Sequence, residues 1–128
     1  MMAGVDAAIY LDADILILSN LTEVWLNFEK NMKHGDTMVA MAANSEETHP
    51  DQCHGGPEQR RRIPQYGDAG LQAGVVLMNL TRMREFGIEN RSVAAYNLYY
   101  DRLELADQDI YNIIFHTYTG GSIHSIKQ

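Results

Sequence analysis

Short apolar runs alternate with longer amphipathic stretches along this chain. Two runs, at residues 7–11 and 15–18, are separated only by Asp12-Ala13-Asp14, and each is too short for a helix. Neither run alternates between apolar and polar positions, which is typical of strands buried on both faces. The sequence therefore predicts two buried strands that flank an acidic turn.

The rest of the chain continues this alternation of strand-like and helix-like segments. Apolar residues at helical spacing predict helices over 21–32, 80–85, 91–103 and 107–117, and further strands are predicted over 37–43 and 70–79. Strands that alternate with helices indicate an α/β fold, so we expect a mostly parallel sheet with flanking helices. Residues 44–68 are polar and contain all three prolines, which predicts a long surface loop.

Composition narrows the possible functions. The chain has 128 residues, of which 45% are hydrophobic, so one domain with a packed core is expected. A net charge of −7 argues against a general nucleic-acid binder, because such proteins need a basic surface. The one basic run, Arg60-Arg61-Arg62, is interpreted as a solvated loop, with an anion-contacting loop as the alternative.

Three features bear on the cellular compartment. No apolar stretch is long enough to span a bilayer, and Cys53, as the single cysteine, excludes an internal disulfide. Asn20, Asn79 and Asn90 each begin an Asn-X-Ser/Thr triplet. These triplets permit a secretory-pathway location without demonstrating one.

Asp12 and Asp14 are the most informative residues, since they directly follow a hydrophobic strand. Ligands of open α/β sheets gather beyond the carboxyl ends of strands. Two carboxylates separated by one small residue can share Mg²⁺ or Mn²⁺ there and leave positions open for substrate phosphates. An ordinary surface turn is the alternative for this triplet.

Two further groups of residues carry candidate chemistry. Asp107-Gln108-Asp109 opens the last predicted helix, where acidic residues also serve as caps that favour the helix dipole. In Leu71-Gln72-Ala73-Gly74 an amide and two small residues precede a strand. Gly74 indicates either a close approach of a ligand or a bulge.

In this order, the three motifs resemble glycosyltransferase family 8. The residues that carry the resemblance are Tyr10-Leu11-Asp12-Ala13-Asp14-Ile15-Leu16, then 72–80, then Asp107-Gln108-Asp109-Ile110-Tyr111-Asn112. Residues 41–43 and 78–84 look most like the glucoside xylosyltransferases. The whole of residues 1–128 is expected to be part of one catalytic domain, with N- and C-terminal parts of the family's domain missing.

The resemblance implies a GT-A fold, which is Rossmann-like, and a retaining transfer of sugar from a UDP-sugar donor with Mn²⁺ or Mg²⁺. By this match, Asp12 and Asp14 coordinate the metal, and Asp12 also lies near the donor ribose. Gln72, Ala73 and Gly74 match donor-binding positions, and Asp107 and Gln108 match the catalytic pair at the donor sugar. Asp109 is expected to cap or support the helix.

The sequence departs from the family pattern in two places. Gln72 replaces the family's more common asparagine, so the amide is one methylene longer. The family's later metal-binding histidine has no counterpart, because His116 and His124 follow the Asp-Gln pair too soon. Both histidines are therefore interpreted as structural or surface residues.

The subfamily resemblance implies UDP-xylose as donor and a glycan acceptor such as O-linked glucose on a protein. It also implies the Golgi or endoplasmic reticulum lumen and a type II membrane protein, anchored by a segment absent from this sequence. The loop at 44–68 is the segment expected to face the acceptor. Two alternatives stay open: a relative that binds nucleotide sugars without transfer, and a phosphohydrolase of the haloacid dehalogenase type, which also places Asp-X-Asp after a strand.

Overall fold

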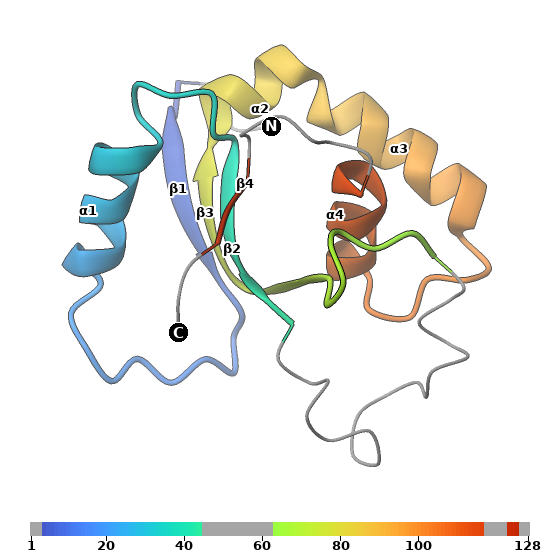
Figure 1. Cartoon of the computed structure of the whole chain (residues 1–128), viewed down its shortest axis with the longest axis horizontal. Coiled ribbons are helices and arrows are strands. Elements are labelled where there is room, and N and C mark those ends of the chain that lie inside the picture. The colour runs from blue at the N-terminus through green and yellow to red at the C-terminus, as the bar shows by residue number, and fades with distance from the viewer. Residues whose placement is uncertain (1–3, 45–62, 117–122, 126–128) are drawn as a thin grey trace.

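The computed structural model describes residues 4–44, 63–116 and 123–125 (Figure 1). Its elements in chain order are β1 (Ala7–Leu11), α1 (Thr22–Asn31), β2 (Val39–Ala43), β3 (Leu71–Asn79), α2 (Leu80–Phe86), α3 (Ile88–Tyr99), α4 (Asp107–Phe115) and β4 (Ile123–Ser125). Every helix and strand predicted from the sequence has a counterpart here except the strand at 15–18. The α/β class is therefore confirmed.

The four strands form one sheet in the order β1-β3-β2-β4. The strand β3 runs antiparallel to both of its neighbours, β1 and β2, and only the pairing of β2 with β4 is parallel. The prediction of a mostly parallel sheet was therefore wrong for the described strands. The strands β1 and β2, which α1 connects, do run parallel to one another. The prediction failed because β3 lies between them and runs in the opposite direction.

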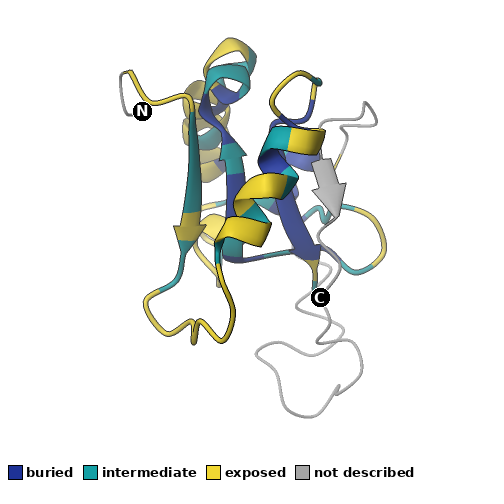
Figure 2. Ribbon diagram, turned by 90° about the vertical axis from the view of Figure 1, so that its left-hand side faces the viewer, coloured by how far each residue is buried: buried dark blue, intermediate teal, exposed yellow. Residues whose placement is uncertain are grey.

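Helices cover both faces of this sheet, with α1 on one side and α3 and α4 on the other (Figure 1). On the α1 face, Phe28 and Met32 pack against Ala40 and Leu77. On the α4 face the fully buried Phe115 lies at the centre of a larger cluster with residues of β2, β3, α2 and α3. The central strands β2 and β3 are accordingly buried on both faces, whereas β1 is partly exposed (Figure 2).

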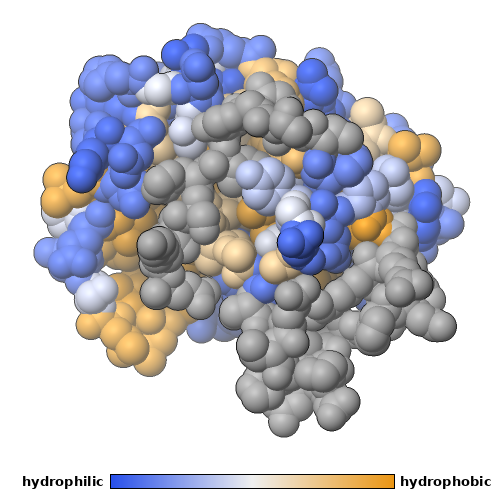
Figure 3. All heavy atoms as spheres, in the orientation of Figure 1, coloured by the Kyte–Doolittle hydropathy of each residue, from blue (hydrophilic) through white to orange (hydrophobic). Residues whose placement is uncertain are grey.

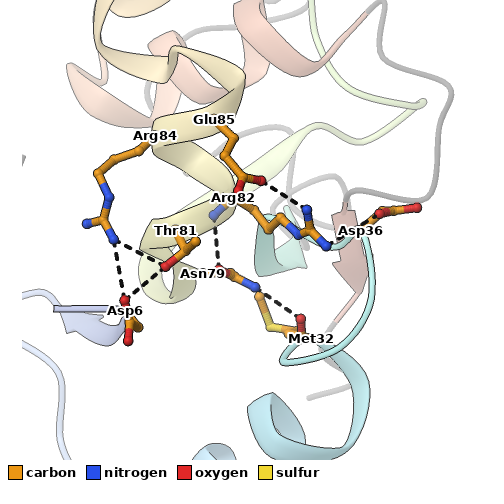
Figure 4. Close-up of polar contacts among 8 residues, drawn as sticks. All are labelled: Asp6, Met32, Asp36, Asn79, Thr81, Arg82, Arg84 and Glu85. Carbon is orange, nitrogen blue, oxygen red and sulfur yellow. Dashed lines mark hydrogen bonds and ion pairs between the residues drawn. The ribbon is translucent and has the colours of Figure 1, made fainter. Parts of the chain in front are cut away.

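The junction between β3 and α2 shows why the chain changes structure at that point. Asn79 is the N-cap of α2, and its Oδ1 accepts a hydrogen bond from the Arg82 N–H at 3.1 Å (Figure 4). Its Nδ2 donates to the Met32 carbonyl at 3.0 Å, which ties α2 to the end of α1. Gly87 ends α2 with a φ of 72°, a left-handed conformation that glycine adopts without strain.

The three glycosylation triplets differ in how far their asparagines are exposed. Asn79 is only 4% exposed and both polar atoms of its amide are bonded, so the folded chain cannot present it to a glycosylating enzyme. Asn20 and Asn90 are exposed. The triplet at Asn79 therefore carries no information about the compartment.

The run at 15–18 is not a buried strand, and that prediction was wrong. The Ile15 N–H bonds to the Asp12 carbonyl at 3.2 Å and closes a turn that leads the chain away from the sheet. Leu16 and Leu18 are consequently 77% and 85% exposed. Apolar atoms gather over this loop after β1, at the lower left of Figure 3.

Several sequence-based interpretations fall outside the described residues. They concern Cys53, the run Arg60-Arg61-Arg62 and most of the loop at 44–68. His124 lies in β4, but only its backbone is described. In the part of the chain that the structure describes, no helix is long and apolar enough to cross a membrane.

Candidate functional site

The end of β1 and the beginning of β3 meet at one edge of the sheet. Leu11 pairs with Val75, and the next residue, Asp12, donates its backbone N–H to the Gly74 carbonyl at 3.0 Å. The antiparallel pairing therefore brings the Asp-Ala-Asp turn next to residues 72–74. Two of the three predicted motifs lie side by side for this reason.

Because Gly74 has no side chain, a methyl-sized space is left between the side chains of these motifs. A Cβ built on Gly74 would lie 3.7 Å from the Asp12 Oδ2, 3.7 Å from the Gln72 Nε2 and 3.5 Å from the Ile15 Cδ1. Carboxylate and amide thus approach the same small volume, and no side chain from residue 74 fills it. The pairing of β3 with β2 also shifts register here, from Met41 opposite Val76 to Ala42 opposite Gln72. The irregularity that the sequence left open for this glycine is therefore present, and the approach of a ligand to its backbone stays a prediction.

The third motif, at the start of α4, contacts the same part of β3. The Gln108 Oε1 accepts a hydrogen bond from the Ala73 N–H at 3.1 Å. This contact holds the first turn of α4 against residues 72–74, directly beside Gly74. All three predicted motifs therefore converge at one edge of the sheet.

Asp107 does not cap α4 through a bond to a distant N–H. Among the described residues, its carboxylate accepts only from the adjacent Gln108 N–H, at 3.0 Å, and its side chain is exposed. Asp109 instead stabilises the turn before α4, because its buried Oδ2 accepts from the N–H groups of Glu104 and Leu105. The supporting role predicted for Asp109 is confirmed, and the Asp107 carboxylate is left available to a ligand.

The negative charge at this site contributes to raised pKa values of two tyrosines. Tyr10 donates its hydroxyl hydrogen to the Asp12 Oδ1 at 2.7 Å, and this bond, with the nearby Asp107 carboxylate, raises the pKa of Tyr10 to about 12. Burial, together with Asp107, raises the pKa of Tyr111. Asp12 and Asp107, which are 95 positions apart in sequence numbering, therefore act on the same phenol.

Asp107 also borders a hollow of about 500 Å³ between β3 and the three helices α2, α3 and α4. Most of the other walls are apolar, and they include Met78, Leu80, Met83, Ile88, Ile110 and Tyr111. The carboxylate therefore lies between the polar edge of the sheet and an apolar recess.

The residues fit a divalent cation in part. The Asp12 Oδ1 is occupied by the Tyr10 hydroxyl, whereas its Oδ2 faces the space over Gly74, and Asp14 is exposed in the turn. Among the described residues, no three His, Cys, Asp or Glu side chains form a metal-binding group. A cation held by Asp12 and Asp14 would thus complete its coordination with phosphate and water oxygens, as Mg²⁺ commonly does.

The histidine assigned a structural role behaves accordingly. The His116 Nδ1 lies 2.9 Å from the Ile113 carbonyl oxygen, one turn earlier in the chain at the end of α4. It is therefore engaged with the helix end and is not directed at the acidic turn.

Sequence reasoning included Tyr10 and Asn112 in its motifs but missed that both side chains support the site. Tyr10 stands two positions before Asp12, and alternate residues of a strand share a face, which was the available signal. Asn112 stands four positions after Gln108 on the same face of α4, and it is buried against the start of β3. The Asp-Gln-Asp motif thus extends by a fourth polar residue, whose spacing could have identified it.

Comparison with known proteins gives matches along nearly the whole chain. The domain described as Glycosyl transferase family 8 matches residues 1–124. Glucoside xylosyltransferase 2 of Xenopus laevis is 32% identical over 127 residues, which cover 91% of this chain and 29% of that protein. Glucoside xylosyltransferase 1 of Rattus norvegicus is 31% identical over 127 residues, with 91% and 28% covered. The chain thus spans less than a third of the length of these curated relatives.

Solved structures agree on the fold. The galactosyltransferase LgtC, in complex with donor and acceptor sugar analogs, matches with a TM-score of 0.71 and 25% identity over 98% of this chain and 40% of that chain. Mouse xyloside xylosyltransferase 1 matches with a TM-score of 0.66 and 22% identity, covering 99% of this chain and 47% of that one. The α/β arrangement described above is therefore a partial GT-A fold, as predicted.

Proposed function

Because the chain belongs to glycosyl transferase family 8, we propose that it supplies the metal- and donor-binding edge of an enzyme that transfers a sugar from a UDP-sugar to a glycan acceptor. The observation that carries this proposal is the convergence of Asp12, residues 72–74 and Gln108 at one edge of the sheet. Convergence of acidic and amide groups around a glycine suits a ligand that carries both a metal-bound diphosphate and hydroxyl groups.

Asp12 and Asp14 are the proposed ligands of Mn²⁺ or Mg²⁺. A bound cation would neutralise the diphosphate charge that develops as UDP departs. The hydrogen bond from Tyr10 fixes one oxygen of Asp12 and leaves the other directed at the space over Gly74. The carboxylate is therefore oriented before the ligand arrives, which lowers the ordering cost of binding.

Gln72, Ala73 and Gly74 are the proposed donor-binding residues, and Asp107 and Gln108 are the proposed catalytic pair. The Gln72 Nε2 lies beside the open space and can donate to a sugar hydroxyl. The exposed Asp107 carboxylate can accept from one. Gln108 contacts β3 through the Ala73 N–H and follows Asp107 directly, which supports its place in the pair.

The donor sugar proposed is xylose, and the acceptor proposed is a glucose attached to a protein. The support is that the matched relatives are glucoside xylosyltransferases, at 31–32% identity. A place in the lumen of the Golgi or the endoplasmic reticulum, as a type II membrane protein, is proposed from the family resemblance alone. Retention of anomeric configuration is proposed from the family alone.

Calorimetry with UDP tests the proposal directly. We expect UDP to bind in the presence of Mn²⁺, and both removal of the metal and the Asp14→Ala substitution to abolish the heat. Asp36→Ala is the matched control, because Asp36 is also an exposed aspartate but precedes β2 at the opposite end of the sheet. Binding that is unaffected by Asp14→Ala would exclude the proposed metal site.

A relative that binds UDP-sugars without transfer is the second candidate. It is favoured by one observation, that no third protein ligand joins the two aspartates among the described residues. Metal-dependent UDP-xylose binding without hydrolysis or transfer to a glucoside would select this candidate. Release of free xylose from UDP-xylose would select the enzyme.

A further inference from the structure

Asn112 is a buried side chain of α4, at the end of the motif that begins with Asp107, and it has no role in the proposed function. It is 4% exposed, and its amide uses its full hydrogen-bonding capacity. Its Oδ1 accepts from the N–H groups of Leu71, at 2.8 Å, and Tyr66, at 3.2 Å. Its Nδ2 donates to the carbonyls of Leu71, at 3.0 Å, and Gln108, at 2.9 Å.

Two of these bonds give the backbone of β3 the partners that a neighbouring strand would otherwise provide. Asn112 satisfies both backbone groups of Leu71 at the point where β3 begins, and no other side chain among the described residues does this. One turn earlier on the same face of α4, Gln108 accepts from the Ala73 N–H. The helix is therefore attached to alternate residues of β3, whose N–H groups point to the same side of a strand.

The attachment determines how Gln108 is presented. Because the Gln108 Oε1 is held by Ala73, its Nε2 is the polar atom left to donate to a ligand, and it has no partner among the described residues. The Asn112 Nδ2 also holds the Gln108 carbonyl, so one side chain restrains both the backbone of Gln108 and the strand that Gln108 contacts. A shift of α4 along β3 would break both attachments together.

We propose that Asn112 is a positioning residue for the donor sugar: it fixes α4 on β3, so that Gln108 and residues 72–74 form one rigid wall of the site. This inference rests on the proposed function for its ligand, a UDP-sugar. The wall faces the sugar and the aspartates face the diphosphate, so loss of Asn112 should weaken binding of the sugar part and spare that of the nucleotide.

The chain offers a matched control in Asn79. It is an equally buried asparagine, also bonded through both polar atoms of its amide, but it lies at the other end of β3, away from the site (Figure 4). Asn112→Ala and Asn79→Ala are therefore expected to lower stability to a similar extent. Asn112→Asp keeps the size and the acceptor oxygen and loses both donors, so it provides a second variant if the alanine variant does not fold.

Two measurements separate positioning from mere stability. Amide hydrogen exchange, followed by NMR, is expected to be about tenfold faster at Ala73 in the Asn112 variants than in Asn79→Ala, although the four hydrogen bonds of Asn112 go to other residues. The dissociation constant for UDP-xylose with Mn²⁺ is expected to rise about fivefold more than that for UDP, whereas Asn79→Ala leaves the ratio unchanged.

Equal exchange at Ala73 in the Asn112 and Asn79 variants would overturn the proposal, and so would an unchanged ratio of the two dissociation constants. The exchange measurement needs no nucleotide. It therefore shows whether Asn112 holds the Gln108–Ala73 contact even if the chain does not bind UDP. A failure to bind UDP would count against the proposed function and not against this role of Asn112.

Discussion

Substitution of Gly74 by alanine should separate the function of this chain from its fold. The added methyl group would make only ordinary contacts, at 3.5 Å from the Ile15 Cδ1 and 3.7 Å from both the Asp12 Oδ2 and the Gln72 Nε2. Gly74 does not have a positive φ, so alanine adds no backbone strain. We expect the free energy of unfolding to stay within about 1 kcal/mol of wild type, with a small gain from reduced freedom of the unfolded chain.

Binding should respond differently, because the methyl group takes the space between Asp12 and Gln72. A donor that approaches the backbone of β3 there must move outward or lose a hydrogen bond. Loss of one such bond, worth about 1–1.5 kcal/mol, corresponds to roughly a tenfold higher dissociation constant for UDP-xylose. Calorimetry with Mn²⁺ measures the affinity, and urea denaturation measures the stability.

Gly70→Ala is the opposite case and serves as the control. Gly70 has a φ of 77°, and a Cβ there would lie 3.1 Å from the Asn112 Oδ1 and 3.4 Å from the Gln65 Oε1. The left-handed backbone alone costs a non-glycine residue about 1–2 kcal/mol. We therefore expect Gly70→Ala to lower the urea midpoint clearly, whereas Gly74→Ala leaves it nearly unchanged.

Two results would refute this reasoning. If Gly74→Ala binds UDP-xylose as tightly as wild type, the space beside Asp12 is not where the donor lies. If instead Gly74→Ala destabilises the chain by more than about 2 kcal/mol, the volume over Gly74 is needed by the protein itself and cannot be assigned to a ligand.

Three further predictions follow from individual contacts. Tyr10 should titrate near pH 12, measured as phenolate absorbance, and Asp12→Asn should move its pKa back toward 10. Because the pKa is higher in the folded chain, the stability that this bond adds is complete below pH 10 and is lost between pH 10 and 12. A normal Tyr10 pKa in the wild type would contradict the Tyr10–Asp12 bond. Asp109→Ala should lower the free energy of unfolding by about 1–3 kcal/mol in urea denaturation, since two backbone N–H groups lose their acceptor, and no change would mean that water replaces it. Phe115→Ala should cost about 3–5 kcal/mol in the same assay because Phe115 is fully buried between Phe86 and Tyr111, and a loss below 1 kcal/mol would show that the core collapses around the cavity.

Periodicity along the chain was enough to place most of the elements. The helices α1, α2 and α4 and the strands β1, β2 and β3 lie where apolar spacing predicted them, since each buries a face that the pattern marks. The run at 15–18 shows the limit of that reasoning. Apolar content predicts a tendency to be buried, but it does not supply a partner, and the turn at Asp12 leads these residues away from the sheet.

Strand direction could not be predicted in the same way. Alternating strands and helices favour parallel pairing, and β1 and β2 do run parallel to one another on either side of β3. The polar segment between β2 and β3 carries no directional signal, so nothing in the pattern indicates that β3 enters between them reversed. The register of β3, with its irregularity opposite Met41 and Ala42, is likewise a product of packing that a single sequence does not reveal.

That reversal is what assembles the candidate site. In a parallel arrangement the end of β1 and the start of β3 would lie at opposite edges of the sheet, about 17 Å apart for a five-residue strand. Asp12 and Gly74 would then be too distant to share a ligand. In the antiparallel arrangement Asp12 bonds directly to Gly74, and Gln108 reaches Ala73 from α4. Three motifs that are separated by dozens of residues thus meet because one strand runs against the pattern. The error in strand direction therefore concerned the feature on which the proposed function most depends.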